Sequence, residues 1–556
     1  MGKFPVLDSF TSEYLILALK RMRRYPALLQ YLLFWAITQL FYFPTRYSGF
    51  VTDFTGLLSR FEGRTAAGIL DCFGFPAMQQ VLNALLYTWH SVFGIAPLPW
   101  YLLQSSLHAL NAFLLLQLGK ALSERLQLPS AHLMGWMAAF LFLLSPYASE
   151  PVTWRVAQNF LLSTAVILGT ARLTLDWLYK PDRHRWVLIQ ILFILGLFTF
   201  ELVLILPILS SLLLLMLPHG SWSKWRRLSL PQLGGVGLYF MLNRLMLGSW
   251  VGHYGAEVHL KFELPVLLGN GLRYTAKHLL FGRNWPHAAK QWLFEGLAQP
   301  TVALGLGGIL IVLLAAGLIF RNRLSNRWRL SIIGLTGFGL ALLPVLNLYF
   351  NYTLHLENDR YGYLASAFLA LVLATGLSAL PRWGRLPLLL AYLGCSSYFL
   401  WQHNQFWWKS TQVYQQMLND FNYYDAPAAY LLNLPDNFQG APMFRDYSGE
   451  DHAFRDALKY IKQQPYDGQI YEVAQYNMTR LTDGATATVD STGTLRVEFN
   501  QWGNWWWRRG IGMGPGYDTE VYEVDSKGHH YFLKLRQPKR GAVFLIQEGL
   551  EWKTVD

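Results

Sequence analysis

The sequence predicts a polytopic α-helical membrane protein with a small soluble domain at its C-terminal end. Only 14% of the 556 residues are charged and 53% are hydrophobic. In a typical soluble protein, roughly a quarter of all residues are charged. Apolar runs of about 17–22 residues, long enough to cross a bilayer, recur along the first 400 residues. The 22 Trp and 30 Tyr residues suit aromatic belts at two membrane interfaces.

The charge distribution and the cysteine content exclude several other classes of protein. The net charge of +12 is carried by short loops between apolar runs, which is the positive-inside pattern and argues against nucleic-acid binding. The first apolar run follows a basic segment at residues 20–24 and lacks a small-residue cleavage site, so we expect no cleavable signal peptide. Two cysteines, Cys72 and Cys395, make no disulfide framework, and no His/Cys metal spacing, P-loop or nucleophile elbow is present.

We expect eleven spans, with the N-terminus in the cytoplasm, in a transmembrane domain over residues 1–400. Long outer loops at 46–97 and 250–299 are expected to carry interfacial helices. Counted this way, nearly all the basic short loops fall on the cytoplasmic side. The predicted spans are, approximately, 27–45, 98–118, 133–149, 159–177, 186–199, 203–217, 232–249, 300–320, 331–349, 364–380 and 386–400.

From about residue 401 the composition becomes that of a soluble, α/β-rich domain, residues 401–556. Because eleven spans separate it from a cytoplasmic N-terminus, we expect this domain to lie outside the cytoplasm. We expect helix with loops to about residue 462 and a β-rich part from about 466, with strands at 485–489, 494–499, 521–524, 531–535 and 542–547. A Trp-rich tract at 502–509 is interpreted either as a membrane anchor or core packing, or as a platform for a sugar or lipid.

Asp53, Glu150, Glu201 and Asp359 all fall on the outer side of this topology. An ionisable residue at membrane depth is expensive and is by default functional. The alternatives are a solvated loop acid for Asp53 and a structural hydrogen bond for Glu201. For Asp359 and its neighbour Arg360 the alternative is a structural salt-bridge network.

Arg155, Arg273, Arg360 and Lys277 add a cluster of cations on the same side. A carboxylate takes a proton from an acceptor hydroxyl, and cations hold a phosphate leaving group as its charge develops. These parts suit the transfer of a group from a lipid phosphate to a hydroxyl.

Four segments, in this order along the chain, resemble one known family. They are Phe-Val-Thr-Asp at 50–53, Ser-Pro-Tyr-Ala-Ser-Glu-Pro-Val-Thr-Trp at 145–154, Thr-Phe-Glu-Leu to the proline at 199–207, and Leu-Pro-Val-Leu-Asn to Asp-Arg-Tyr-Gly-Tyr-Leu at 343–364. Over roughly residues 30–420 the chain resembles GT-C class membrane glycosyltransferases that use polyprenyl-phosphate sugars. Within that class it resembles the tetratricopeptide-carrying O-mannosyltransferases, the protein O-mannosyltransferases and their bacterial relatives.

The resemblance implies an inverting transfer in which Asp53 is the general base and Glu150 orients the acceptor or assists Asp53. Arg360, with Arg155 or Lys277, would hold the donor phosphate. Further substrate-binding residues implied are Trp154, Glu201, Arg273, Asp359 and Tyr361.

The chain also departs from the family. The first loop has a single acid where relatives often have two, so we expect no cofactor and do not favour a divalent metal. Gln158 stands where the family has an arginine, Phe200 where a lysine is usual and Asp359 where a glutamate is usual. Tetratricopeptide repeats are replaced by the C-terminal domain, so the acceptor does not carry over.

The implied partners are a polyprenyl-phosphate sugar donor, a protein, glycan or lipid acceptor, and membrane lipids. A bacterial inner (plasma) membrane is the expected location, with the site facing the periplasm or exterior. Two alternatives remain open at this point: transfer of a longer glycan or non-sugar group to a lipid or envelope polymer, and transport of a lipid-linked glycan by a flippase.

Overall fold

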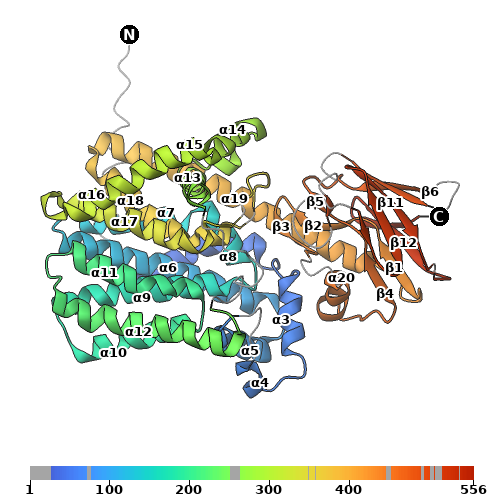
Figure 1. The fold of residues 1–556 in the computed structure, drawn as a ribbon, viewed down its shortest axis with the longest axis horizontal. Coiled ribbons are helices and arrows are strands. Elements are labelled where there is room, and N and C mark those ends of the chain that lie inside the picture. Colours follow the sequence, from blue (N-terminus) through green and yellow to red (C-terminus); the bar gives the residue numbers. More distant parts are fainter. Residues whose placement is uncertain are drawn as a thin grey trace, which may run out of the picture.

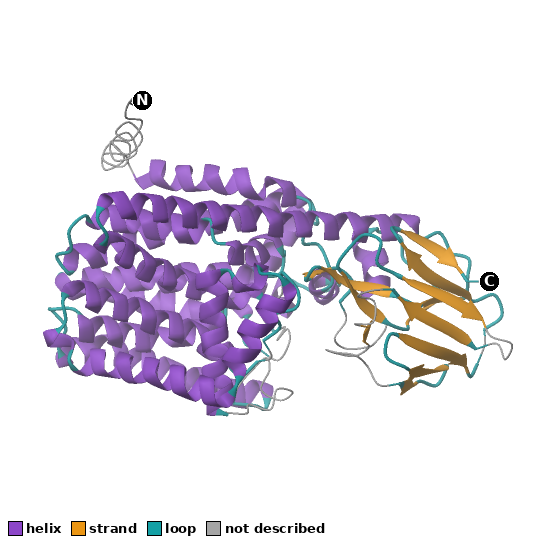
Figure 2. Cartoon of the chain, turned by 90° about the horizontal axis from the view of Figure 1, so that it is seen from above, coloured by secondary structure: helices purple, strands orange, loops and turns teal. Residues whose placement is uncertain are grey.

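The computed structural model is mostly helical up to residue 420 and sheet-rich beyond it (Figures 1 and 2). It describes residues 27–71, 77–250, 263–348, 350–356, 358–445, 452–489, 494–500, 506–507, 516–537 and 539–555. The expected N-terminal basic segment, Cys72 and most of the Trp-rich tract lie outside the described residues.

Helices fill the first part of the described chain, broken by short 3-10 and π-helical turns. The α-helices are α2 Ala27–Tyr42, α3 Asp53–Phe61, α4 Ala66–Leu70, α5 Gln80–Phe93, α6 Pro97–Arg125, α7 Ala131–Leu143, α8 Ser149–Thr153, α9 Gln158–Tyr179, α10 Arg183–Leu197, α11 Leu206–Met216, α12 Trp222–Leu247, α13 Leu264–Leu280, α14 His287–Ala298, α15 Pro300–Val302, α16 Gly308–Ile319, α17 Asn326–Leu342, α18 Tyr363–Ala379, α19 Arg382–Asp420 and α20 Ala453–Asp456. The short turns are η2 Phe43–Thr45, η3 Pro146–Ala148, η4 Glu201–Ile205, η5 Gly282–Asn284, η6 Ala303–Gly307, η7 Arg321–Arg323, η8 Leu343–Val345, η9 Asp359–Gly362 and η10 Ala457–Ile461.

Each of the predicted spans coincides with helical structure, and five helical segments of the described chain are long and apolar enough to cross a membrane. A sixth arises if α7 and the η3–α8 segment, bent by 58°, are counted together. The remaining predicted spans are shorter, as in α10, or less apolar, as in α6 and α19. The segments that meet the length and composition criteria are Ala27–Thr45, Gln158–Tyr179, Pro300–Ile319, Asn326–Val345 and Asp359–Ala379.

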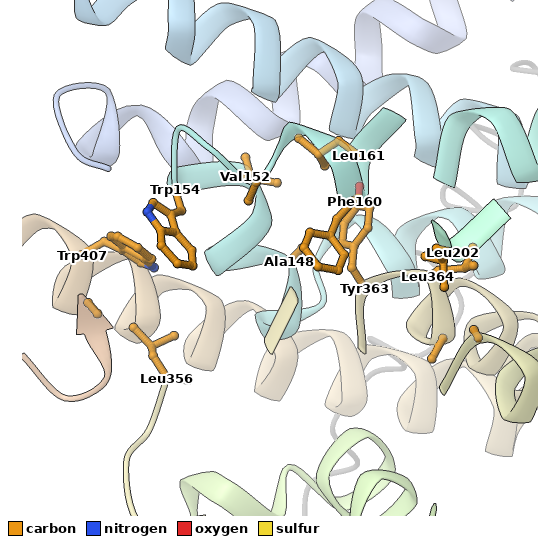
Figure 3. Packing of buried hydrophobic residues seen from close by; sticks show 14 of the residues in the cluster. Ala148, Val152, Trp154, Phe160, Leu161, Leu202, Leu356, Tyr363, Leu364 and Trp407 are labelled. Carbon is orange, nitrogen blue, oxygen red and sulfur yellow. The ribbon is translucent and has the colours of Figure 1, made fainter. Parts of the chain in front are cut away.

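The core of the helical part forms around α6, which packs against α2, α7 and α9. Leu115, Leu116 and Leu118 of α6 are buried there. Figure 3 shows the core next to α8, where Ala148, Val152 and Trp154 lie among side chains of α9, α18 and α19. Burial of apolar side chains on every side of α8 holds this short helix in place.

Two prolines explain why α8 is separate from α7. Pro146 and Pro151 lack a backbone N–H and prevent a continuous helix. The chain therefore ends α7 at Leu143, makes the η3 turn and restarts at an angle as α8. This bend places Glu150 at the end of the helical bundle instead of inside a straight helix.

The C-terminal part contains three sheets, with strand orders β13-β12-β1-β4, β6-β7-β11-β10-β9 and β3-β2-β5-β8. The first and third sheets include parallel pairs, β1 with β12 and β4, and β2 with β5. The strands are β1 Ala428–Leu431, β2 Leu434–Phe438, β3 Ala441–Pro442, β4 Gln469–Glu472, β5 Gln475–Met478, β6 Ala485–Val489, β7 Leu495–Phe499, β8 Trp506–Trp507, β9 Tyr517–Asp518, β10 Tyr522–Ser526, β11 His530–Leu535, β12 Val543–Glu548 and β13 Glu551–Thr554.

The five strands expected beyond residue 484 are confirmed as β6, β7, β10, β11 and β12. The expectation of helix with loops up to about residue 462 is wrong for β1, β2 and β3. Every residue of β1 and β2 is buried, so these strands lack the alternation that marks a half-exposed strand.

Helix α19 joins the two parts, running without interruption from the helical bundle to the sheets (Figure 1). A second connection lies where the loop before η9 meets the β2–β3 turn. The Leu356 N–H donates to the Gln439 carbonyl at 2.9 Å. Gly440, with φ of +94°, lies so close that a Cβ on it would overlap the Leu356 carbonyl oxygen at 1.6 Å.

Gly49 makes a similarly close approach in the turn that leads to α3. Its φ is +85°, and a Cβ would lie 2.0 Å from the Thr153 carbonyl oxygen. The Gly49 carbonyl also accepts a hydrogen bond from the Arg155 N–H at 3.1 Å. This contact fixes the turn before Asp53 against the end of α8.

We predict that Gly49→Ala lowers the free energy of unfolding by at least about 1 kcal/mol, because alanine disfavours positive φ and its methyl group would displace the Thr153 carbonyl. Thermal or denaturant unfolding of the detergent-solubilised protein measures this. Gly56→Ala is the matched control, since Gly56 lies within α3 and a Cβ there meets nothing within 4 Å. Equal stabilities of the two variants would contradict the predicted contact.

Candidate functional site

Asp53 is the first residue of α3, and the turn before it is held by aromatic packing. The Phe50 ring meets the Phe54 ring edge-on at 4.9 Å, and Phe54 meets Trp100 at 5.2 Å. The Phe54 N–H donates to the Val51 carbonyl at 2.9 Å. Asp53 is half-buried as a result, and among the described residues its carboxylate forms no hydrogen bond.

Glu150 of α8 forms an ion pair with Arg360 of η9. The Glu150 Oε2 accepts a hydrogen bond from the Arg360 backbone N–H at 2.8 Å, and Oε1 accepts one from the guanidinium Nη1. Because the Glu150 carboxylate accepts both bonds, it fixes the backbone and the side chain of Arg360 relative to α8. Charge-assisted pairs of this kind are among the stronger hydrogen bonds in proteins.

Aromatic rings flank the Arg360 guanidinium. Its Cζ lies 4.8 Å from the centroid of the Trp154 ring and 4.7 Å from that of Tyr361. Such cation–π contacts orient a guanidinium without neutralising it. The structure therefore gathers Glu150, Trp154, Arg360 and Tyr361, as the sequence predicts.

Asp359 forms a second ionic cluster in a completely buried position. Its Oδ1 lies 2.5 Å from Lys277 Nζ and 2.7 Å from Arg283 Nη1, and all three side chains are at most 1% exposed. Burial lowers the pKa of Lys277 to about 8, while the Asp359 carboxylate opposes that shift. The Tyr147 hydroxyl of η3 donates to the Lys277 carbonyl, so the cluster also joins α13 to the segment before α8.

Three arginines act electrostatically on Asp53. Burial raises the pKa of the Asp53 carboxyl above its ordinary value, and the guanidiniums of Arg360, Arg445 and Arg60 oppose this rise. Arg360 is thus ion-paired with Glu150 and also acts electrostatically on Asp53. This makes a site in which one cation and two acids come from three separate segments of the chain.

Arg445 belongs to the C-terminal part of the protein. Its guanidinium binds the Asp436 carboxylate of β2, with Nε at 3.0 Å and Nη2 at 2.9 Å from Oδ2. Its carbonyl accepts a hydrogen bond from the Thr52 hydroxyl. The sheet region therefore contacts the residue immediately before Asp53.

Two other predicted cations are occupied by structural contacts. Arg155 is completely buried, and its guanidinium donates to Gln104 Oε1 at 2.6 Å and to the Thr45 carbonyl at 2.9 Å. Arg273 donates through Nε to the Phe294 carbonyl at 2.8 Å. These bonds attach Arg155 to α6 and η2, and Arg273 to α14.

Glu201 lies at the start of η4 and is half-buried. The Glu201 carboxyl interacts with the Tyr239 side chain of α12. Phe200, its neighbour, packs on Phe160 at 4.8 Å, and Phe160 in turn lies 6.0 Å from Tyr361. Glu201 is thus connected to the site through aromatic packing, and Tyr239 is the polar side chain that the structure places against it.

Arg283 and Arg445 are site residues that sequence reasoning missed. Each lies far along the chain from its partner, 76 residues for Arg283 and Asp359 and 393 for Arg445 and Thr52. No local spacing reveals contacts of that range. The isolated arginine after the 264–280 helix was the available signal for Arg283, because its neighbours include no acid to pair with it.

No group of three or more His, Cys, Asp and Glu side chains that could hold a metal ion is found within the described residues. Two of the acids are ion-paired: Glu150 with Arg360, and Asp359 with Lys277 and Arg283. The arrangement provides a carboxylate able to accept a proton beside a guanidinium able to bind an anion.

We predict that Asp359→Asn lowers the free energy of unfolding by about 3 kcal/mol or more, because it leaves Lys277 and Arg283 buried without their counterion. Unfolding of the detergent-solubilised protein by denaturant measures the loss. Asp176→Asn serves as the control, since Asp176 pairs with Arg172 one helical turn away and both side chains are about 30% exposed. That variant should lose about 0.5 kcal/mol or less, and similar losses in both variants would contradict the role of the buried cluster.

Comparison with known proteins adds no family to this description. No protein-family model matches the chain, and a search of curated proteins finds no related sequence.

Proposed function

We propose that the protein is an inverting glycosyltransferase that moves a sugar from a polyprenyl phosphate to an acceptor hydroxyl. The observation that carries this proposal is the ion pair between Glu150 and Arg360, whose guanidinium also acts electrostatically on Asp53. A base beside an anion-binding cation is what transfer from a lipid phosphate requires. The ordered motifs shared with GT-C class enzymes support the same reaction.

In the proposed step the Asp53 carboxylate takes the proton of the acceptor hydroxyl. The acceptor oxygen attacks the anomeric carbon, the bond from that carbon to the phosphate oxygen breaks, and the polyprenyl phosphate leaves with the electron pair. Glu150 keeps Arg360 in position through two hydrogen bonds. Holding the reacting groups in place supplies much of the rate enhancement of such a transfer.

Arg360 is the residue we assign to the donor phosphate. Its side chain is 14% exposed, compared with 1% for Lys277 and Arg283 and 0% for Arg155. A phosphate arriving from solvent or lipid therefore meets Arg360 first. Lys277 contributes indirectly, by fixing Asp359 and with it the position of the neighbouring Arg360.

The proposed topology has eleven spans, a cytoplasmic N-terminus and the site on the opposite face of a bacterial inner membrane. The alternation of basic loops supports this arrangement. In it, α5 and α13 lie along the membrane interface and the sheets stand outside the cytoplasm. The donor sugar is then presented by its lipid at the depth of Arg360, where α8 and η9 meet.

We predict that Asp53→Asn lowers the transfer rate at least about 100-fold, because an amide does not accept the proton. Release of polyprenyl phosphate from synthetic polyprenyl-phosphate hexoses, by purified protein in detergent with an envelope extract as acceptor source, measures the rate. Detergent removes compartments, so a transporter would release nothing. Asp71→Asn is the control, because Asp71 is an exposed acid of the same loop and should leave the rate unchanged.

The stability of Asp53→Asn separates loss of chemistry from loss of folding. Folding raises the pKa of Asp53, so the folded protein favours the protonated acid. The protonated Asp53 side chain therefore stabilises the folded state at low pH. This stabilisation is lost as the pH rises through the pKa that Asp53 has in the folded protein. At neutral pH the asparagine variant should unfold no more easily than the wild type. Undiminished transfer by this folded variant would remove Asp53 from the proposed role.

We predict that the rate of transfer falls on acidification at a higher pH than an ordinary aspartate, with a pKa of about 4, would give. A base must be ionised, and burial raises the pKa of Asp53. Because the Arg60 guanidinium lowers that pKa, Arg60→Met should move the acid limb of the pH–rate profile to still higher pH. Arg64→Met is the matched control on the same segment and should leave the limb in place. A shift to lower pH in Arg60→Met would contradict the electrostatic coupling.

A further inference from the structure

A cavity of about 420 Å³ lies at the boundary between the helices and the sheet region. It is lined by the turn before α3, by the corner between α5 and α6, by α19, and by Ile461 at the end of η10 with Gln463 beyond it. This volume falls in the range of small-molecule binding sites, which is about 300–1,000 Å³. Because four separate segments contribute, the cavity exists only where the two parts of the protein meet.

The cavity wall is uncharged. No Asp, Glu, Lys or Arg is found among the described residues that line it. It offers the aromatic side chains of Tyr47, Phe50 and Tyr414, aliphatic surface at the α5–α6 corner, and the amides of Gln415 and Gln463. Aromatic faces with a few amide and hydroxyl groups suit a ligand that is neutral, partly apolar and rich in hydroxyls.

Two amides of the wall are open to a ligand. The Gln415 and Gln463 side chains line the cavity, are exposed, and form no hydrogen bond within the described chain. Their amide groups can therefore donate to and accept from the hydroxyls of a ligand. The Tyr414 hydroxyl is buried away from the cavity, so Tyr414 offers only the surface of its ring.

The cavity lies next to Asp53. Phe50 and Val51 line it, and Val51 precedes Asp53 by two residues. Since the chain spans at most about 3.6 Å per residue, the Cα atoms of Val51 and Asp53 lie within about 7 Å. The Phe50 ring connects the wall directly to α3 through its contact with Phe54.

We propose that this cavity binds the acceptor of the reaction, and that the bound portion of the acceptor is a neutral carbohydrate. This inference rests on the proposed function and adds the class of acceptor to it. A sugar ring packed on the aromatic wall and hydrogen-bonded to Gln415 and Gln463 would have a hydroxyl within reach of Asp53. The uncharged wall disfavours acidic sugars, because a carboxylate placed there would lose its hydration without gaining a counterion.

Saturation-transfer NMR on the purified full-length protein tests the inference, with maltose, cellobiose and N,N′-diacetylchitobiose as probes. The detergent must lack a sugar headgroup, which would compete for the cavity. At least one of these disaccharides should bind the wild type in the millimolar range. Ala96→Trp fills the α5–α6 corner of the cavity and should weaken binding more than tenfold. Ala66→Trp, at an exposed helix start outside the cavity, should leave binding unchanged.

Gln415→Met is a second variant that keeps the length of the side chain and removes only the amide. The loss of its hydrogen bonds should weaken disaccharide binding about three- to tenfold. Absence of disaccharide binding to the wild type, or binding that neither Ala96→Trp nor Gln415→Met weakens, would overturn the inference. A neutral Gly-Ser-Gly peptide that binds in place of the sugars, with the same sensitivity to Ala96→Trp, would also overturn it.

Donor turnover keeps this inference separate from the proposed function. If polyprenyl phosphate is released from the donor but no disaccharide binds, only the carbohydrate acceptor is wrong. If a disaccharide binds in the cavity but no donor is consumed, the binding site stands and the transferase function fails.

Discussion

The ion pairs made by the neighbouring residues Asp359 and Arg360 determine how the candidate site is assembled. Asp359 binds Lys277 and Arg283 on one side, and Arg360 binds Glu150 on the other. One short turn, η9, is thereby attached to α13, to η5 and to α8. Buried ion pairs recover their cost of desolvation only when their geometry is good. The three segments must therefore be folded together before Arg360 can act electrostatically on Asp53.

The sheet region forms one wall of the site. Arg445 contacts Thr52 and acts electrostatically on Asp53, while Asp436 of β2 holds its guanidinium. The β2–β3 turn also packs against Leu356, three residues before Asp359. Asp53 and Asp359 therefore both lie close in sequence to contacts with the C-terminal part. In the proposed reaction this part acts as a component of the catalytic centre, because removing it would expose the turn before Asp53.

The sequence predicts the helices well and the contacts between them poorly. Long apolar runs specify helices such as α9 and α18 without reference to the rest of the chain, and alternating residues identify strands such as β7 and β11. The strands β1 and β2 were missed because burial on both faces removes that alternation. Of the candidate site, the sequence singles out Asp53, Glu150 and Arg360, because acids and a cation stand out in an apolar sequence. The structural role of Arg155 and the participation of Arg283 and Arg445 depend on partners distant in sequence, which no local pattern reports.

Helix α19 has 39 residues, which at 1.5 Å per residue makes a rod of roughly 58 Å. A flexible linker would let a soluble domain sample many orientations and capture substrates at a distance. A continuous helix instead holds the sheets at a fixed distance and angle from the bundle. A ligand that binds at the boundary between the two parts therefore pays no entropic cost for bringing them together. The binding surface is assembled before any ligand arrives, but the sheets cannot move out to capture a distant substrate.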